Sequence, residues 1–115
     1  MRIRVAVGSN DGKYINQHFG HAQKFLIFDI NEKENYEYVE TRNNIPSCNE
    51  GDHTSGSLES TINILKDVDI VLVSQIGPGA SQYLLNNRIQ PVIMPGFIDE
   101  KLDKISKNLI DKKQE

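Results

Sequence analysis

The first part of the chain carries the hydrophobic pattern of three strands. Val5 and Val7 lie on one face of an alternating stretch, which predicts a strand over about 2–8. A short apolar run predicts a buried strand over 25–30, and a second alternating stretch predicts another over 36–42. Because the residues between the last two strands are polar and typical of turns, these strands are expected to form a hairpin.

The second part of the chain combines helical spacing with short apolar runs. Apolar residues recur at i, i+4 and i+7 over 58–65 and again over 98–109, which predicts a helix in each range. A further helix is expected to begin near Pro78, since proline suits the first turn of a helix. The apolar runs over 69–73 and 91–94 predict strands that are covered on both faces.

In chain order these elements give the topology β-β-β-α-β-α-β-α. We expect an α/β domain with a ribonuclease H-like mixed five-stranded sheet, strand order 3-2-1-4-5, and helices on its faces. The first strand would lie centrally beside the fourth, at a switch point where open α/β sheets bind ligands. The prediction is one domain over 1–110, followed by a C-terminal tail over 111–115 that frays.

Two segments of the chain lack the regular spacing of hydrophobic residues that marks a helix or a strand. Residues 13–23 are expected to form a loop with one helical turn. Residues 43–57 are rich in glycine, asparagine and serine, which predicts a long loop. Such a loop is either ordered and functional or a disordered insertion.

Composition narrows the class of protein. The 115 residues suit a single globular domain, with 25% charged and 37% hydrophobic residues. The net charge of −3 gives no reason to expect nucleic-acid binding. We expect no membrane contact, because the sequence has neither a signal-peptide pattern nor an apolar run long enough to span a bilayer. One cysteine allows no disulfide within the chain, so a reducing cytoplasm is the expected location.

The side chains that could bind a metal fall in two loop segments. His18 and His21 lie at i and i+3, a spacing that places both imidazoles on one face of a turn. The alternative is a capped turn with two surface histidines. Cys48 lies five residues before His53, and thiolate with imidazole favours zinc, copper, iron or an iron–sulfur species. The alternative for Cys48 is an inert thiol.

A glycine-rich turn supplies a further candidate. Gly77-Pro78-Gly79 opens a helix after a buried strand, where backbone N–H groups suit an anion or the sulfides of a cluster. The alternative is a tight strand-to-helix turn.

Enzyme templates fit poorly. No carboxylate cluster of a nuclease is present, and Cys48 with His53 on one irregular loop lacks a third orienting group. The chain is therefore not expected to be an enzyme.

Several separated motifs occur together in this chain. They are Val5-Ala6-Val7, Ser9-Asn10-Asp11-Gly12, Asn16-Gln17-His18-Phe19-Gly20-His21-Ala22, Phe25, Arg42, Cys48, Gly51, His53 and Ile76-Gly77-Pro78-Gly79-Ala80. In this set, over about residues 1–105, the chain resembles the dinitrogenase iron-molybdenum cofactor biosynthesis family, as a small stand-alone member. The resemblance implies a ribonuclease H-like fold without nuclease activity. It also implies binding or delivery of iron–sulfur precursors of the nitrogenase cofactor.

The site residues follow from the same resemblance. It implies that four side chains bind the metal or cofactor, those of His18, His21, Cys48 and His53. It also implies that the cofactor contacts the backbone at Gly77 and Gly79. The leading hypothesis is a non-catalytic carrier of an iron–sulfur cluster or an iron–molybdenum cofactor precursor, with a client or assembly protein as partner. A homodimer would place two Cys48 loops around one cluster. The alternative is a protein-interaction or regulatory module that uses the same loop mouth without metal.

Overall fold

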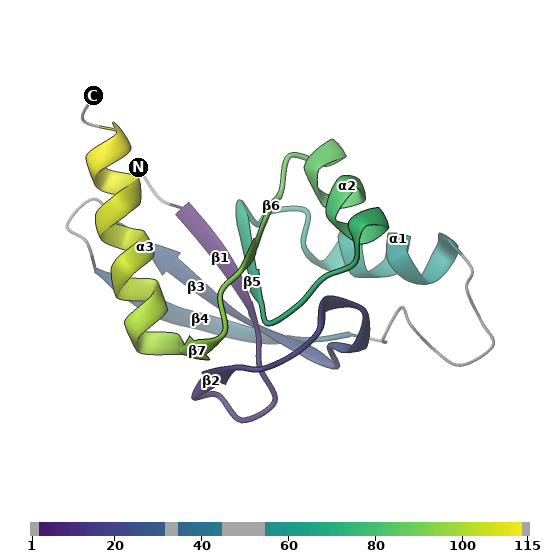
Figure 1. Cartoon of the computed structure of the whole chain (residues 1–115), viewed down its shortest axis with the longest axis horizontal. Coiled ribbons are helices and arrows are strands. Elements are labelled where there is room, and N and C mark those ends of the chain that lie inside the picture. The colour runs from purple at the N-terminus through teal and green to yellow at the C-terminus, as the bar shows by residue number, and fades with distance from the viewer. Residues whose placement is uncertain (1–2, 32–34, 45–54, 114–115) are drawn as a thin grey trace.

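A computed structural model describes residues 3–31, 35–44 and 55–113. Within these ranges the main sheet has five strands in the order β4-β3-β1-β5-β6 (Figure 1). The strands are β1 (Ile3–Gly8), β3 (Lys24–Ile30), β4 (Tyr36–Asn43), β5 (Ile70–Val73) and β6 (Gln90–Ile93). The sheet is mixed, because β1 pairs antiparallel with β3 and parallel with β5.

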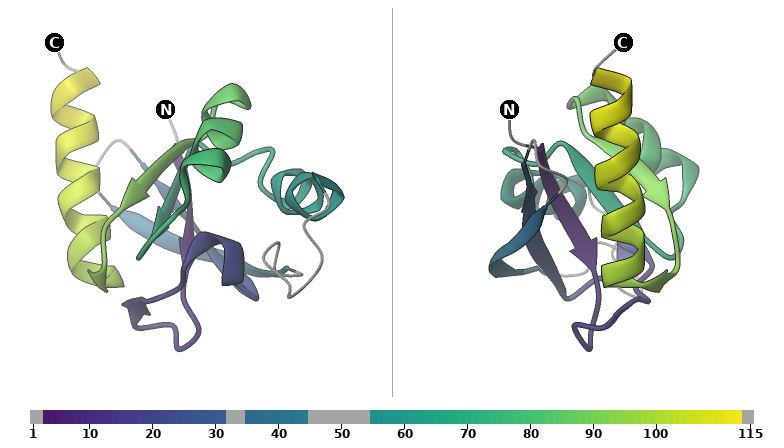
Figure 2. Two further views of the ribbon diagram at one scale, coloured as in Figure 1. Left: turned by 45° about the vertical axis from the view of Figure 1, so that its right-hand side comes forward. Right: turned by 90° about the vertical axis from the view of Figure 1, so that its left-hand side faces the viewer.

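Helices cover both faces of this sheet, so the domain has three layers (Figure 2). The described residues contain three α-helices, α1 (Ser55–Ile64), α2 (Pro78–Asn86) and α3 (Ile98–Lys113). Side chains along β1 point alternately to the two faces of the sheet, so this strand contributes to the hydrophobic core on each face. Ala6 lies in the cluster with buried residues of α1 and α2, whereas Val5 and Val7 lie in the cluster with α3. The predicted five-stranded mixed sheet and three helices are confirmed.

Two short strands were not predicted. The helical turn expected within 13–23 is present as the 3-10 turn η1 (Phe19–His21), and the same segment also forms the strand β2 (Tyr14–Ile15). The strand β2 pairs antiparallel with β7 (Gly96–Phe97) in a small second sheet. Two-residue strands are too short to show a period, so the pattern could not reveal them. The helix α3 continues to Lys113, into the segment that was expected to fray.

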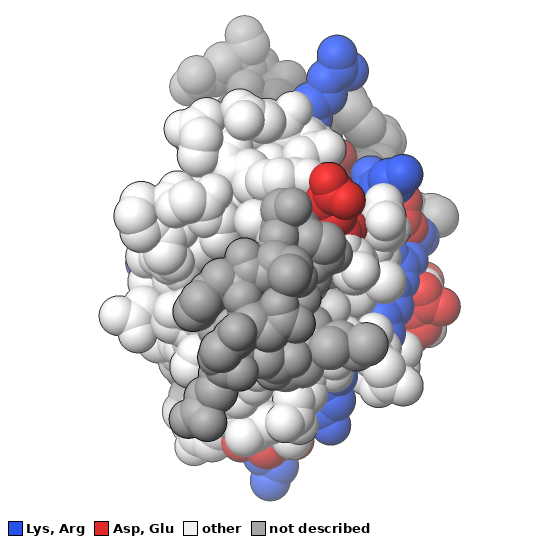
Figure 3. All heavy atoms as spheres, turned by 90° about the vertical axis from the view of Figure 1, so that its right-hand side faces the viewer, with Lys and Arg blue, Asp and Glu red and all other residues white. Residues whose placement is uncertain are grey.

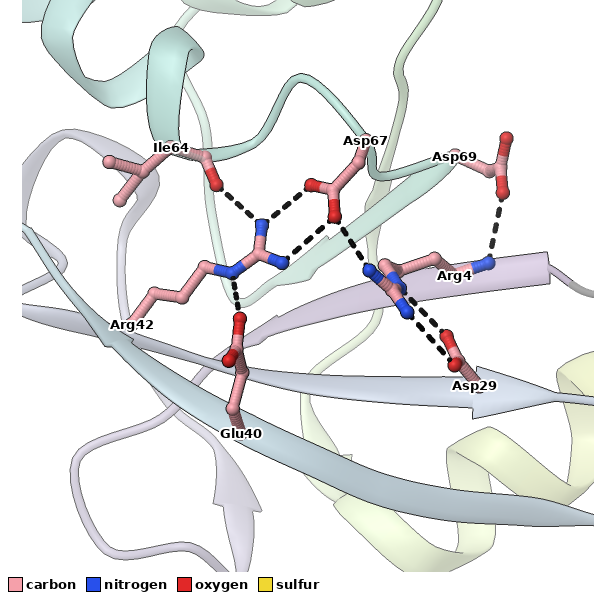
Figure 4. A network of polar contacts seen from close by, with 7 residues as sticks. All are labelled: Arg4, Asp29, Glu40, Arg42, Ile64, Asp67 and Asp69. Carbon is pink, nitrogen blue, oxygen red and sulfur yellow. Dashed lines mark hydrogen bonds and ion pairs between the residues drawn. The ribbon is translucent and has the colours of Figure 1, made fainter.

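An arginine–aspartate network ties the sheet to the connection between α1 and β5 (Figure 4). Arg4 of β1 contacts Asp29 of β3 at 2.8 Å and Asp67 at 2.6 Å. Arg42 of β4 donates to both carboxylate oxygens of Asp67 and to the carbonyl of Ile64. Asp67 therefore joins two strands through two guanidinium groups. Arg42, one of the motif residues, thus has a structural role in this network.

Candidate functional site

The turn after β1 is shaped by its own polar side chains. Asp11 accepts from the backbone N–H groups of Lys13 and Tyr14, both at 2.9 Å, and these hydrogen bonds hold the pKa of its carboxyl below the ordinary value. The hydroxyl of Ser9, a fully buried residue, accepts from the N–H of Gly12 at 3.0 Å. The motif Ser9-Asn10-Asp11-Gly12 thus folds the chain back toward the end of β1.

The returning segment packs closely against Gly8, the last residue of β1. The Gly8 carbonyl accepts from the N–H groups of Asn16 and Gln17. A Cβ on Gly8 would lie 3.2 Å from Val73 Cγ1 and 3.3 Å from Gln17 Cβ, so a larger residue would push this segment outward. The close approach brings residues 17–19 to the carboxyl ends of β1 and β5. Open α/β sheets place ligands at this edge.

Backbone pairing fixes the histidine turn on the segment that follows β5. The Phe19 N–H donates to the Gln75 carbonyl at 2.8 Å, and the Ser74 N–H donates to the Gln17 carbonyl at 3.0 Å. The Phe19 side chain is fully buried, so it anchors the turn in the core. Gln75 could not be identified from the sequence, because its contact with the turn uses the backbone and leaves no side-chain pattern.

The two histidine rings lie side by side. Their centroids are 4.8 Å apart, with 43° between the ring planes. His21 is exposed and His18 is half-buried. The His18 Nδ1 accepts from the N–H of Gly20 at 3.0 Å, so this imidazole caps η1. The i, i+3 spacing thus brings both imidazoles together, on a turn that is also capped by one of them.

Burial and a neighbouring ring both favour the neutral form of His18. Partial desolvation lowers the pKa of the imidazole, and the adjacent His21 lowers it further, because two positive charges would repel each other. A neutral imidazole can bind a metal, whereas an imidazolium cannot.

The glycine turn follows directly on the contact with Gln75. Gly77 is the N-cap of α2 and makes no side-chain capping bond, and Pro78 occupies the first turn. A Cβ at Gly77 or Gly79 would meet no atom of the described structure within 4 Å. Packing among the described residues therefore does not demand glycine at these positions. The helix N-terminus presents backbone N–H groups of a kind that bind anions.

The other two predicted anchors, Cys48 and His53, lie outside the described residues. Among the residues that the structure describes, no group of three or more His, Cys, Asp and Glu side chains could hold a metal ion. The described donor set is thus a pair of imidazoles, which suits iron, zinc or copper. A pair of imidazoles is too small a set to enclose a bare ion, but it fits a cluster that brings its own sulfide ligands.

Charged side chains are sparse on the molecular face around α1. In the view of Figure 3, most of the described surface carries neither a basic nor an acidic side chain, and the charged residues lie mainly along one margin.

In the described ranges, no helix has the length and hydropathy needed to cross a membrane.

Comparison with known sequences identifies the family. The family model described as "Dinitrogenase iron-molybdenum cofactor" matches residues 1–108. The chain belongs to this dinitrogenase iron-molybdenum cofactor family. One similar protein is the FeMo cofactor biosynthesis protein NifB of Frankia alni, which is 33% identical to this chain. The match covers 94% of this chain and 22% of the length of that protein. NifB of Azotobacter vinelandii is 35% identical over 65% of this chain and 15% of its own length. The chain thus spans about a fifth of the curated relatives it matches.

Two solved structures have a fold similar to that of this chain. The crystal structure of PH0822 has a TM-score of 0.70 and 26% identity, covering 92% of this chain and 91% of that one. A crystal structure from Methanocaldococcus jannaschii has a TM-score of 0.63 and 16% identity, covering 94% and 91%. At this level of identity the second likeness concerns the fold alone.

Proposed function

We propose that this chain is a non-catalytic binding or carrier protein for an iron–sulfur-type metallocofactor or its precursor. The setting would be the biosynthesis of the iron–molybdenum cofactor, named for the NifB relatives, or general iron–sulfur metabolism. The observation that carries the proposal is the pair of imidazoles, 4.8 Å apart at the carboxyl edge of β1 and β5. We also propose that the protein is cytoplasmic. We further propose that its fold is ribonuclease H-like, which the strand order of the main sheet supports.

The chemistry of the pair suits a cargo that must be released. A few bonds from neutral imidazoles hold a cluster less firmly than a full set of thiolates, and each bond competes with a proton. Uptake should therefore weaken in acid, where protons compete with the metal for the imidazole nitrogens. Gly77 and Gly79 would contribute backbone N–H groups near the same edge. Cys48 and His53 are proposed as further anchors on the strength of the family resemblance.

The test is anaerobic reconstitution with iron and sulfide, followed by desalting and visible absorption. The wild-type chain should acquire cluster absorption, and the double variant His18→Ala/His21→Ala should lose most of it. Gln82→Ala, at an exposed position on α2, is the matched control and should behave as wild type. Absence of cluster absorption in the wild type, or equal absorption in the double variant, contradicts the proposal. Elemental analysis of protein purified without chelator separates a carrier from the metal-free interaction module.

Partners are proposed on chemistry alone. A carrier needs a protein that supplies or accepts the cluster, and a homodimer would double the number of Cys48 side chains available to it. Sedimentation of the apo and the reconstituted chain tests the dimer. A rise in mass on loading supports it, and an unchanged monomer mass contradicts it.

A further inference from the structure

The two histidines of the site are chemically unequal, because only one of them holds the turn. The His18 Nδ1 accepts from the backbone N–H of Gly20 at 3.0 Å. An N–H group requires a lone pair on its acceptor, so this nitrogen carries no proton. A neutral imidazole has one N–H, which must then be on Nε2. His18 in this position offers its Nε2 as a hydrogen-bond donor.

We propose that His18 donates a hydrogen bond through Nε2–H to an anionic group of the cargo, whereas His21 supplies the lone pair that binds its metal. The site would then select a ligand that presents a metal beside an anionic acceptor such as a sulfide or thiolate sulfur. A bare metal ion would be bound weakly, through His21 alone. This division of roles rests on the proposed function and specifies the ligand class for the same site.

Metal binding by the Nε2 of His18 would break the cap. The ring would have to move its proton to Nδ1, where it would face the N–H of Gly20. Gly20 is buried, so its N–H would lose its partner in a place with little access to water. Metal-binding histidines ordinarily use the other ring nitrogen to donate a hydrogen bond, and His18 has the opposite arrangement.

His21 is free of this constraint by its position. Its backbone N–H donates to the His18 carbonyl at 2.9 Å, which holds the two residues together, while its side chain is exposed. The ring lies 4.8 Å from that of His18, close enough for both to reach one ligand. The backbone of His18 pairs with that of Gln75, which lies two residues before Gly77, the N-cap of α2. The first N–H groups of a helix are donors of the same polarity as His18 Nε2–H, and donors of this kind favour an anionic partner.

The first test concerns the tautomer and needs no cargo. Long-range ¹H–¹⁵N correlation spectra of the apo chain, labelled at histidine, report which ring nitrogen carries the proton. His18 should show an unprotonated Nδ1 and a protonated Nε2 at neutral pH. A proton on Nδ1 in the neutral ring would overturn the inference, whatever the chain binds.

The second test separates the two roles by matched variants. In His18→Asn the amide oxygen can replace Nδ1 as the cap of Gly20, but the Nε2–H is lost. In His18→Gln the amide N–H reaches toward the position of Nε2. After reconstitution with iron and sulfide, His18→Asn should bind the cluster about tenfold to a hundredfold more weakly than wild type, the effect of losing a hydrogen bond to a charged group. His18→Gln should retain more of the binding than His18→Asn does.

Titration with Co²⁺ alone supplies the contrasting arm. Wild type and His18→Asn should bind the bare ion equally weakly, and His21→Ala should remove this binding. If His18→Asn weakens Co²⁺ binding as much as His21→Ala, both rings chelate and the inference is wrong. If wild type acquires no cluster at all, the proposed function fails. If wild type and His18→Asn acquire the cluster equally well, the function survives and only the division of roles fails.

Discussion

Replacing Asp67 with asparagine tests whether the arginine–aspartate network stabilises the fold. The carboxylate accepts from Arg42 Nη1 at 2.6 Å, Arg42 Nη2 at 2.9 Å and Arg4 Nη1 at 2.6 Å. Asparagine has the same shape but lacks the charge and one acceptor oxygen. It therefore removes the ionic part of three contacts that join β1, β4 and the α1–β5 connection.

The expected loss is moderate because the group is partly solvated. The Asp67 side chain is 47% exposed, whereas those of Arg42 and Arg4 are 19% and 26% exposed. An exposed ion pair contributes roughly 0.2–1 kcal/mol, and a two-pronged arginine contact contributes more. Allowing for solvent screening, we expect Asp67→Asn to lower the free energy of unfolding by about 1–2 kcal/mol at neutral pH.

The loss should depend on pH in a defined direction. The hydrogen bonds from Arg42, desolvation in the opposite sense and the hydrogen bond from Arg4 together hold the pKa of Asp67 far below its ordinary value. A carboxyl group with a lowered folded-state pKa stabilises the fold fully above its unfolded pKa of about 4. That stabilisation disappears as the pH falls toward the folded-state value. The difference between wild type and Asp67→Asn should therefore shrink below about pH 4.

Urea denaturation followed by circular dichroism, at neutral pH and at several values below 4, measures this difference. The matched control is Asp103→Asn, since Asp103 contacts Lys107 at 3.4 Å with both side chains more than half exposed. The control should cost about 0.5 kcal/mol or less. Equal losses for the two variants, or a loss at Asp67 that does not change with pH, would show that the charge of Asp67 does not stabilise the fold.

Further predictions concern the histidine turn. Phe19→Ala should lower the free energy of unfolding by about 3–5 kcal/mol in urea denaturation, because the ring is fully buried; a loss below about 1 kcal/mol contradicts its role as the anchor. In an NMR titration His18 should show a pKa below the ordinary 6.5, and His21→Ala should raise it by removing a like charge; a value unchanged by this variant contradicts the coupling. Gly79→Ala should leave stability within about 1 kcal/mol of wild type, since a Cβ there meets nothing within 4 Å, yet it should weaken cluster uptake if the ligand approaches this backbone.

The larger elements of the fold could be predicted because each leaves a period in the sequence. Alternation along β1 and the i, i+4 spacing along α3 mark their buried faces. The pairing of β2 with β7 could not be predicted, because two-residue strands carry no period and their partners lie far apart in sequence. The contact of Arg42 with Asp67, across 25 positions, likewise depends on how the sheet and the α1–β5 connection meet.

The histidine pair was only partly accessible from the sequence. Spacing at i and i+3 indicated that the rings share a face, and the structure places them 4.8 Å apart. A capped turn was the alternative that the sequence offered, but that His18 itself caps Gly20 could not be foreseen, because this contact depends on the rotamer of His18 in an extended backbone position. Participation of Cys48 and His53 stays a prediction, since both lie outside the described residues.

X-ray absorption at the iron edge of the anaerobically reconstituted chain identifies the atoms that surround the bound iron. We expect sulfur neighbours from the cluster together with a nitrogen neighbour from the protein. The nitrogen contribution should fall in His21→Ala and persist in Gln82→Ala. Iron with no sulfur neighbours, or a spectrum that is the same in wild type and His21→Ala, would contradict the claim that this turn holds an iron–sulfur cargo.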